Sequence, residues 1–101
     1  ILSEYAVELM KVNRLNDTVI KDFNWSQLKG YGYGLGVRTH IKPELSGCMS
    51  NIGEFGWNGA AGAAVIADTK AKLAVFYTQH CLNPREEFYM PRLKNIVYSC
   101  L

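Results

Sequence analysis

The chain lacks an apolar run of about 18 residues, the shortest that would form a membrane-spanning helix. It also lacks a basic-then-apolar leader, and it opens Ile-Leu-Ser without a methionine, so we expect no targeting signal and a segment cut from a longer protein. Its net charge is only +2 and its basic residues do not cluster. These absences argue against a membrane span, nucleic acid and an anionic membrane surface as partners.

Patterns typical of disulfide frameworks and metal sites are missing too. The three cysteines, Cys48, Cys81 and Cys100, are far apart, and an odd number cannot form a complete framework. Neither Cys-x-x-Cys nor His-x-x-x-His occurs, so we expect no zinc, and nothing indicates another metal or an organic cofactor. His80 and Cys81 are neighbours, but neighbours on a strand point to opposite faces and cannot pair as base and nucleophile.

What is present is an ordinary globular composition, 49% hydrophobic and 20% charged, over 101 residues, which is one domain or less. Residues 4–13 predict a short helix with Ser3 as its N-cap. Asn83 is expected to cap a second helix that has Pro84 at its first position. Pro91 predicts a break in that helix and the start of another. The packed face of this last helix is expected to comprise Leu93, Ile96, Val97 and Cys100.

Between the helices, a period of two predicts three strands, over residues 31–41, 55–67 and 72–79. Residues 68–71 have turn chemistry, so the last two strands are expected to form a hairpin. The strand at 72–79 is apolar on both faces, which indicates a central, covered strand. The predicted fold class is α+β, an antiparallel sheet of about three strands with flanking helices.

Residues 53–62, GEFGWNGAAG, are the segment most indicative of chemistry. They place four glycines and two aromatic residues at the start of a strand, whose backbone would stay accessible. A backbone amide left free there can donate to a developing oxyanion. Small residues at a tight packing crossover would explain the same pattern without any chemistry.

Five blocks of the sequence resemble, in order, the C-terminal part of serine β-lactamase-related proteins, which include class C β-lactamases, D-alanyl-D-alanine carboxypeptidases and esterases. The blocks cover residues 1–10, 22–25, 30–37, 53–62 and 74–79. In that family a Ser-x-x-Lys motif supplies the nucleophile and its base partner. A Tyr-x-Asn motif supplies a second proton-transfer group, and a strand motif of the Lys-Thr-Gly or His-x-Gly type lines the far wall.

The resemblance implies that only the third motif is present, at Trp57-Asn58-Gly59, close to members with Trp-Gly-Gly. It implies an oxyanion-donating amide at Ala60 and a small Gly59, along which substrate can lie. Asn58 stands where many relatives have a small residue. Trp57 replaces the cation that would bind a β-lactam carboxylate, which favours an ester or amide as substrate over penicillin.

The nucleophile is therefore expected to be missing from this chain, so that no catalytic residue is assigned. Ser26 is followed three residues later by Lys29, but the family's motif lies far upstream, so this spacing is interpreted as a coincidence. No Tyr-x-Asn occurs. Phe55 and Trp57 are expected to be wall and packing residues.

The expected function is that of a C-terminal fragment of a β-lactamase-like serine hydrolase, inactive alone, with residues 1–101 forming one segment of a β-lactamase/transpeptidase-like fold. Its partners would be the rest of the parent hydrolase and, when isolated, further copies of itself. Two alternatives stay open. One is a non-catalytic peptide- or glycan-binding module with Tyr31, Tyr33, Phe55 and Trp57 as its aromatic surface, and the other is a degenerate homologue with a structural role.

Overall fold

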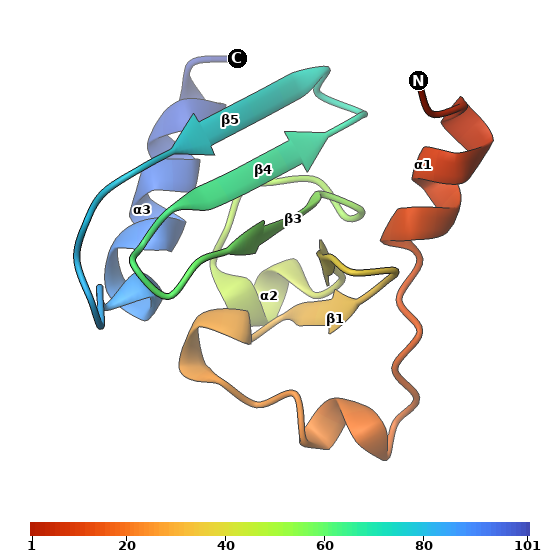
Figure 1. The fold of residues 1–101 in the computed structure, drawn as a ribbon, viewed down its shortest axis with the longest axis horizontal. Coiled ribbons are helices and arrows are strands. Elements are labelled where there is room, and N and C mark those ends of the chain that lie inside the picture. Colours follow the sequence, from red (N-terminus) through yellow and green to blue (C-terminus); the bar gives the residue numbers. More distant parts are fainter.

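An antiparallel sheet dominates the computed structural model, which describes all residues, 1–101 (Figure 1). Its five strands follow one another in the order β1-β2-β3-β4-β5, so each strand pairs with its neighbour in the sequence. The strands are β1 (Tyr31–Tyr33), β2 (Arg38–His40), β3 (Phe55–Asn58), β4 (Ala64–Asp68) and β5 (Leu73–Tyr77). The predicted α+β class is confirmed.

Helices precede and follow the sheet in the chain, and one short helix lies between β2 and β3. They are α1 (Glu4–Lys11), the short 3₁₀ turns η1 (Val19–Lys21) and η2 (Ser26–Leu28), α2 (Pro43–Ser46) and α3 (Glu86–Ser99). In Figure 1, α3 lies behind the sheet, while α1 stands to one side of it. None of the helices combines the length and apolarity needed to cross a membrane.

Two predicted strands are each a hairpin, which corrects the count from three strands to five. The amide of Gly34 donates to the carbonyl of Val37, and Gly36 has a positive φ of 77°, so the chain reverses inside residues 31–41. The same happens between β3 and β4, where Gly59 donates to Ala63 and Gly62 has a φ of 87°. Glycine reaches this backbone region at no steric cost, so these glycines make turns rather than strand interior.

The prediction that the strand at 72–79 is central and covered is wrong, because β5 is an edge strand. Its predicted hairpin with β4 is confirmed, with Asp68 opposite Leu73. The carboxylate of Asp68 accepts the amides of Lys70 and Ala71 at 2.9 and 3.0 Å, which closes the turn. β5 has apolar residues on both faces, but one of these faces stays open. The pattern therefore does not indicate a covered strand here.

The helix predictions need three corrections. The first helix ends at Lys11, because the Asn13 side chain instead accepts the amides of Leu15 and Tyr33. The last helix begins at Glu86, not after Asn83, since Asn83 and Arg85 both adopt positive φ. It then runs unbroken through Pro91, whose neighbour Met90 is anchored in the core. Ser3 does cap the first helix, accepting the amide of Ala6 at 3.2 Å.

The interior has two different halves. Beneath β4 and β5 lies a small apolar core of Ala64, Ile66 and Met90, with Val75, Tyr77, Tyr89 and Leu93 packed around it. Beneath β1–β3 the buried side chains are mostly polar or charged, among them Arg38, His40, Glu54 and Lys94. The buried face of α3 thus carries Met90 and Lys94, whereas Ile96 and Cys100 of the predicted face are exposed.

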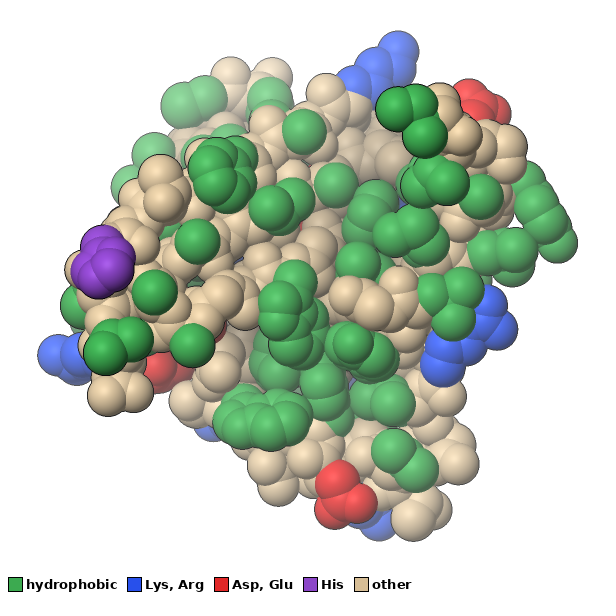
Figure 2. Space-filling model, in the orientation of Figure 1, with side chains coloured by type: hydrophobic (Ala, Val, Ile, Leu, Met, Phe, Trp, Pro, Cys, Tyr) green, Lys and Arg blue, Asp and Glu red, His purple; other side chains and the backbone are tan.

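The face of the sheet opposite α3 is uncovered and apolar. Trp57, Val65 and Phe76 stand opposite one another on β3, β4 and β5, and they are 44%, 49% and 73% exposed. Figure 2 shows hydrophobic side chains gathered across this side of the molecule, with charged groups at its rim. We call Trp57, Val65 and Phe76 the open face.

We expect the isolated chain to form dimers or larger assemblies at micromolar concentration. An open apolar face beside an unpaired strand edge is a surface to which another copy can pair. Phe76→Lys should shift the sedimentation coefficient towards the monomer. Ile96→Lys should not, since Ile96 is as exposed but lies on α3, away from the open face. A wild-type chain that sediments as a clean monomer in analytical ultracentrifugation would contradict this expectation.

Candidate functional site

An open groove of about 580 Å³ runs along the end of β3 and the turn that follows. Trp57, Asn58, Gly59 and Ala60, the four residues assigned from the sequence, all line it. The opposite wall is formed by residues 83–87, where the chain enters α3, and Gln27 of η2 closes one side. The fold therefore brings the four assigned residues to one concave surface.

The turn after β3 leaves one amide of the groove unused. The amide of Gly59 donates to the carbonyl of Ala63 at 2.7 Å, and that of Gly62 donates to Gly59 at 2.9 Å. Neither of the amides between them, those of Ala60 and Ala61, has an acceptor within the chain, and of the two only Ala60 lines the groove. Ala60 is exposed on the groove wall, so this N–H is available to a bound molecule.

The backbone conformation at position 59 does not require glycine. A Cβ placed there would meet nothing nearer than the carbonyl oxygen of Ala63, at 3.7 Å, which is an ordinary contact. By contrast, a Cβ at Gly56 would lie 1.9 Å from the carbonyl oxygen of Val65. A side chain at position 59, which lines the groove, would therefore fit without disturbing the fold.

The side chains of Trp57 and Asn58 point to opposite sides of β3 and make different contacts. The Trp57 ring packs edge-on against Tyr33, with centroids 5.5 Å apart. The Oδ1 atom of Asn58 accepts a hydrogen bond from Nε of Arg38 at 3.3 Å. Burial raises the pKa of the nearby Glu86 carboxyl, against the opposing influence of the Asn58 amide and the Arg38 charge.

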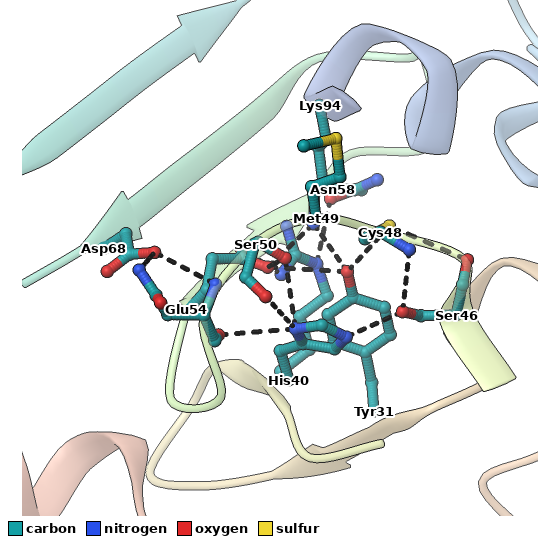
Figure 3. A network of polar contacts seen from close by, with 12 residues as sticks. Tyr31, His40, Ser46, Cys48, Met49, Ser50, Glu54, Asn58, Asp68 and Lys94 are labelled. Carbon is teal, nitrogen blue, oxygen red and sulfur yellow. Dashed lines mark hydrogen bonds and ion pairs between the residues drawn. The ribbon is translucent and has the colours of Figure 1, made fainter. Parts of the chain in front are cut away.

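Behind the groove, three charged side chains form a buried cluster, and Figure 3 labels two of them, Glu54 and Lys94. Nη1 of Arg38 donates to Oε1 of Glu54 at 2.8 Å, and Nζ of Lys94 donates to Oε2 of Glu54 at 2.9 Å. Their side chains are 2%, 0% and 1% exposed. Lys94 also donates to the Tyr31 hydroxyl at 2.7 Å, so the cluster joins β1, β2 and α3.

Contacts within the cluster shift the pKa values of Glu54 and Lys94. Burial alone would raise the pKa of Glu54, but the charges of Arg38 and Lys94 outweigh burial and hold it below its ordinary value. Burial, together with repulsion by Arg38, lowers the pKa of Lys94 to about 8, although Glu54 opposes this. At neutral pH two cations therefore share one carboxylate.

His40 and Ser46 form a pair that resembles a base and a nucleophile. Nε2 of His40 lies 2.6 Å from Oγ of Ser46, and its Nδ1 lies 3.1 Å from the carbonyl oxygen of Ser50. The His40 ring is 0% exposed, and burial lowers its pKa, so it is neutral at pH 7. The Oγ atom of Ser46 already accepts a hydrogen bond from the amide of Cys48. The His40–Ser46 pair therefore holds the end of α2 in place.

The four residues singled out from the sequence lie together in the groove, but the cluster behind it was missed. Arg38, Glu54 and Lys94 were not singled out, although Lys94 is spaced four residues from Met90 and one from Leu93, on the stripe that α3 buries. A lysine within a packed stripe signals a buried ion pair.

Ser26 and Lys29, interpreted as a coincidence, both line a second pocket beside the groove.

The sequence matches no protein-family model, and no curated protein is significantly similar to it.

Proposed function

We propose that this chain is the C-terminal part of a β-lactamase-related serine hydrolase, and that the groove along residues 57–60 binds an ester or amide substrate. The observation that carries the proposal is the unpartnered amide of Ala60 on the groove wall. Acyl transfer to a serine develops negative charge on the carbonyl oxygen, and fixed amide donors stabilise that charge.

Each assigned residue has one role in this proposal. The Ala60 amide donates to the oxyanion, and a second donor would come from the amide of the absent serine. Gly59 leaves room for the acyl group beside the strand, and Trp57 forms the wall. Asn58 holds the strand to Arg38, which fixes the direction of β3.

The remaining parts of the site would come from the parent chain. The open edge of β5 and the open face give that chain surfaces on which to pack. The parent protein would supply Ser-x-x-Lys and Tyr-x-Asn, and catalysis would need no metal or organic cofactor.

The test uses the isolated chain and the full-length protein side by side. We expect the chain alone to hydrolyse neither a chromogenic cephalosporin nor a p-nitrophenyl ester, since its nucleophile is absent. The full-length protein should react with a fluorophosphonate at the serine of an upstream Ser-x-x-Lys. Turnover by the chain alone that disappears in Ser26→Ala or Ser46→Ala would overturn the proposal, and so would a full-length protein that leaves the probe unreacted.

A further inference from the structure

A second pocket, of about 280 Å³, lies beside the groove. It is bounded by η2, by the buried cluster and by α3, and Gln27, Asn58 and Glu87 line both pocket and groove. Three cations, Lys29, Arg38 and Lys94, line it, against the single carboxylate of Glu87. We call it the cationic pocket.

Charge is unbalanced on the inner wall of this pocket. Arg38 and Lys94 are both buried, and Glu54 is the one carboxylate that pairs with either of them. The Glu86 carboxyl is influenced by the Arg38 charge but forms no ion pair with it and does not line the pocket. A net positive charge held inside a protein is costly unless an anion approaches it. A single negative charge would neutralise this wall.

Two hydrogen-bond donors on the same wall are unused. Nη2 of Arg38 has no acceptor, although Nε and Nη1 are bonded to Asn58 and Glu54. The ammonium of Lys94 has three N–H groups, of which two are bonded, to Tyr31 and Glu54. Buried donors without a partner are rare in folded proteins and call for an explanation.

We propose that the cationic pocket binds the carboxylate of a small organic acid. The spare donors of Arg38 and Lys94 match the two oxygens of a carboxylate, since guanidinium recognises that planar group well. One negative charge suits the pocket better than the two of a phosphate. Leu45, Met90 and Pro91 line the rest of the pocket and suit a short hydrocarbon tail. This proposal stands apart from the hydrolase proposal, because it concerns binding to this chain alone.

The experiment is a titration of the ¹⁵N-labelled chain with butyrate, followed by NMR at constant ionic strength. Butyramide, which has the same shape without the charge, and inorganic phosphate are titrated alongside. We expect saturable shifts around residues 26–29 and 46–48 with butyrate, and at least tenfold weaker binding of butyramide. If the chain self-associates, all titrations use the Phe76→Lys background.

Lys29→Gln should weaken butyrate binding several-fold, because Lys29 is exposed and lines the pocket without supporting the core. Lys70→Gln is its matched control, an exposed lysine on the β4–β5 turn, and should bind as the wild type does. Arg38→Lys keeps the charge and removes Nη2, and should abolish binding where its spectrum shows a folded chain. The proposal is overturned if butyrate shows no saturable shift, if butyramide binds equally well, if phosphate binds more tightly, or if the two lysine variants behave alike.

Discussion

Replacing Glu54 with glutamine should destabilise the chain by about 3–5 kcal/mol, the range measured when one partner of a buried ion pair is removed. The glutamine keeps the shape and one acceptor, but it leaves Arg38 and Lys94 buried without their shared counter-ion. Urea unfolding at pH 7, with an unchanged m-value, measures the loss. Glu44→Gln, an exposed carboxylate on α2, is the matched control and should change stability by less than about 0.5 kcal/mol.

The pH dependence of this loss has a definite sign. The pKa of Glu54 is lowered by folding, so its contribution is present above the ordinary value of 4.5 and disappears as the pH falls through the folded value. The difference between wild type and Glu54→Gln should therefore shrink in acid. It should also shrink as the pH rises towards the wild-type Lys94 pKa of about 8, because Glu54 raises that pKa and the lysine of the variant therefore releases its proton at a lower pH. A constant difference from pH 3 to pH 9 would show that Glu54 acts by packing alone.

Gly59→Val in the full-length hydrolase should lower kcat/KM by about 100-fold or more, comparable to the loss of an oxyanion donor. The added side chain would stand in the groove and displace substrate from the Ala60 amide. Because the nearest atom to a Cβ at this position lies 3.7 Å away, the variant should fold normally. A loss of activity can then be attributed to the groove.

Two further variants make this test quantitative. Gly59→Ala should give a smaller loss than valine, as expected if the volume of the side chain decides the effect. Ala71→Val adds a comparable volume in the β4–β5 turn, away from the groove, and should leave kcat/KM unchanged. Near-normal activity in Gly59→Val, or an equal loss in Ala71→Val, would remove the role assigned to residues 57–60.

The sequence predicts the fold class and the order of elements, but it misplaces the turns. The alternation of residues 31–41 continues through a reversal at Gly34–Val37, so its periodicity does not reveal that the strand folds back. Arg38, directly after this reversal, is buried although it is charged. A glycine that adopts a positive φ cannot be distinguished, from the sequence alone, from one that allows close packing.

The four residues assigned from the sequence lie together in the groove because they are consecutive, so local sequence keeps them together. The cluster behind it could not be predicted, since Arg38, Glu54 and Lys94 are separated by 16 and 40 residues and meet only through tertiary packing. Burial of β5 was predicted wrongly for a related reason. Whether an apolar face is covered depends on where α3 docks, and one helix of this length covers one face.

The sheet order also determines how the chain reaches its structure. A meander pairs each strand with the one just synthesised, so every β contact closes a short loop and carries a small entropic cost. The contact between Lys94 and Tyr31 spans 63 residues and closes by far the longest loop among the polar contacts of the buried cluster. Folding should therefore proceed strand by strand, with the docking of α3 as the slow, late step, at which three charged groups leave water together.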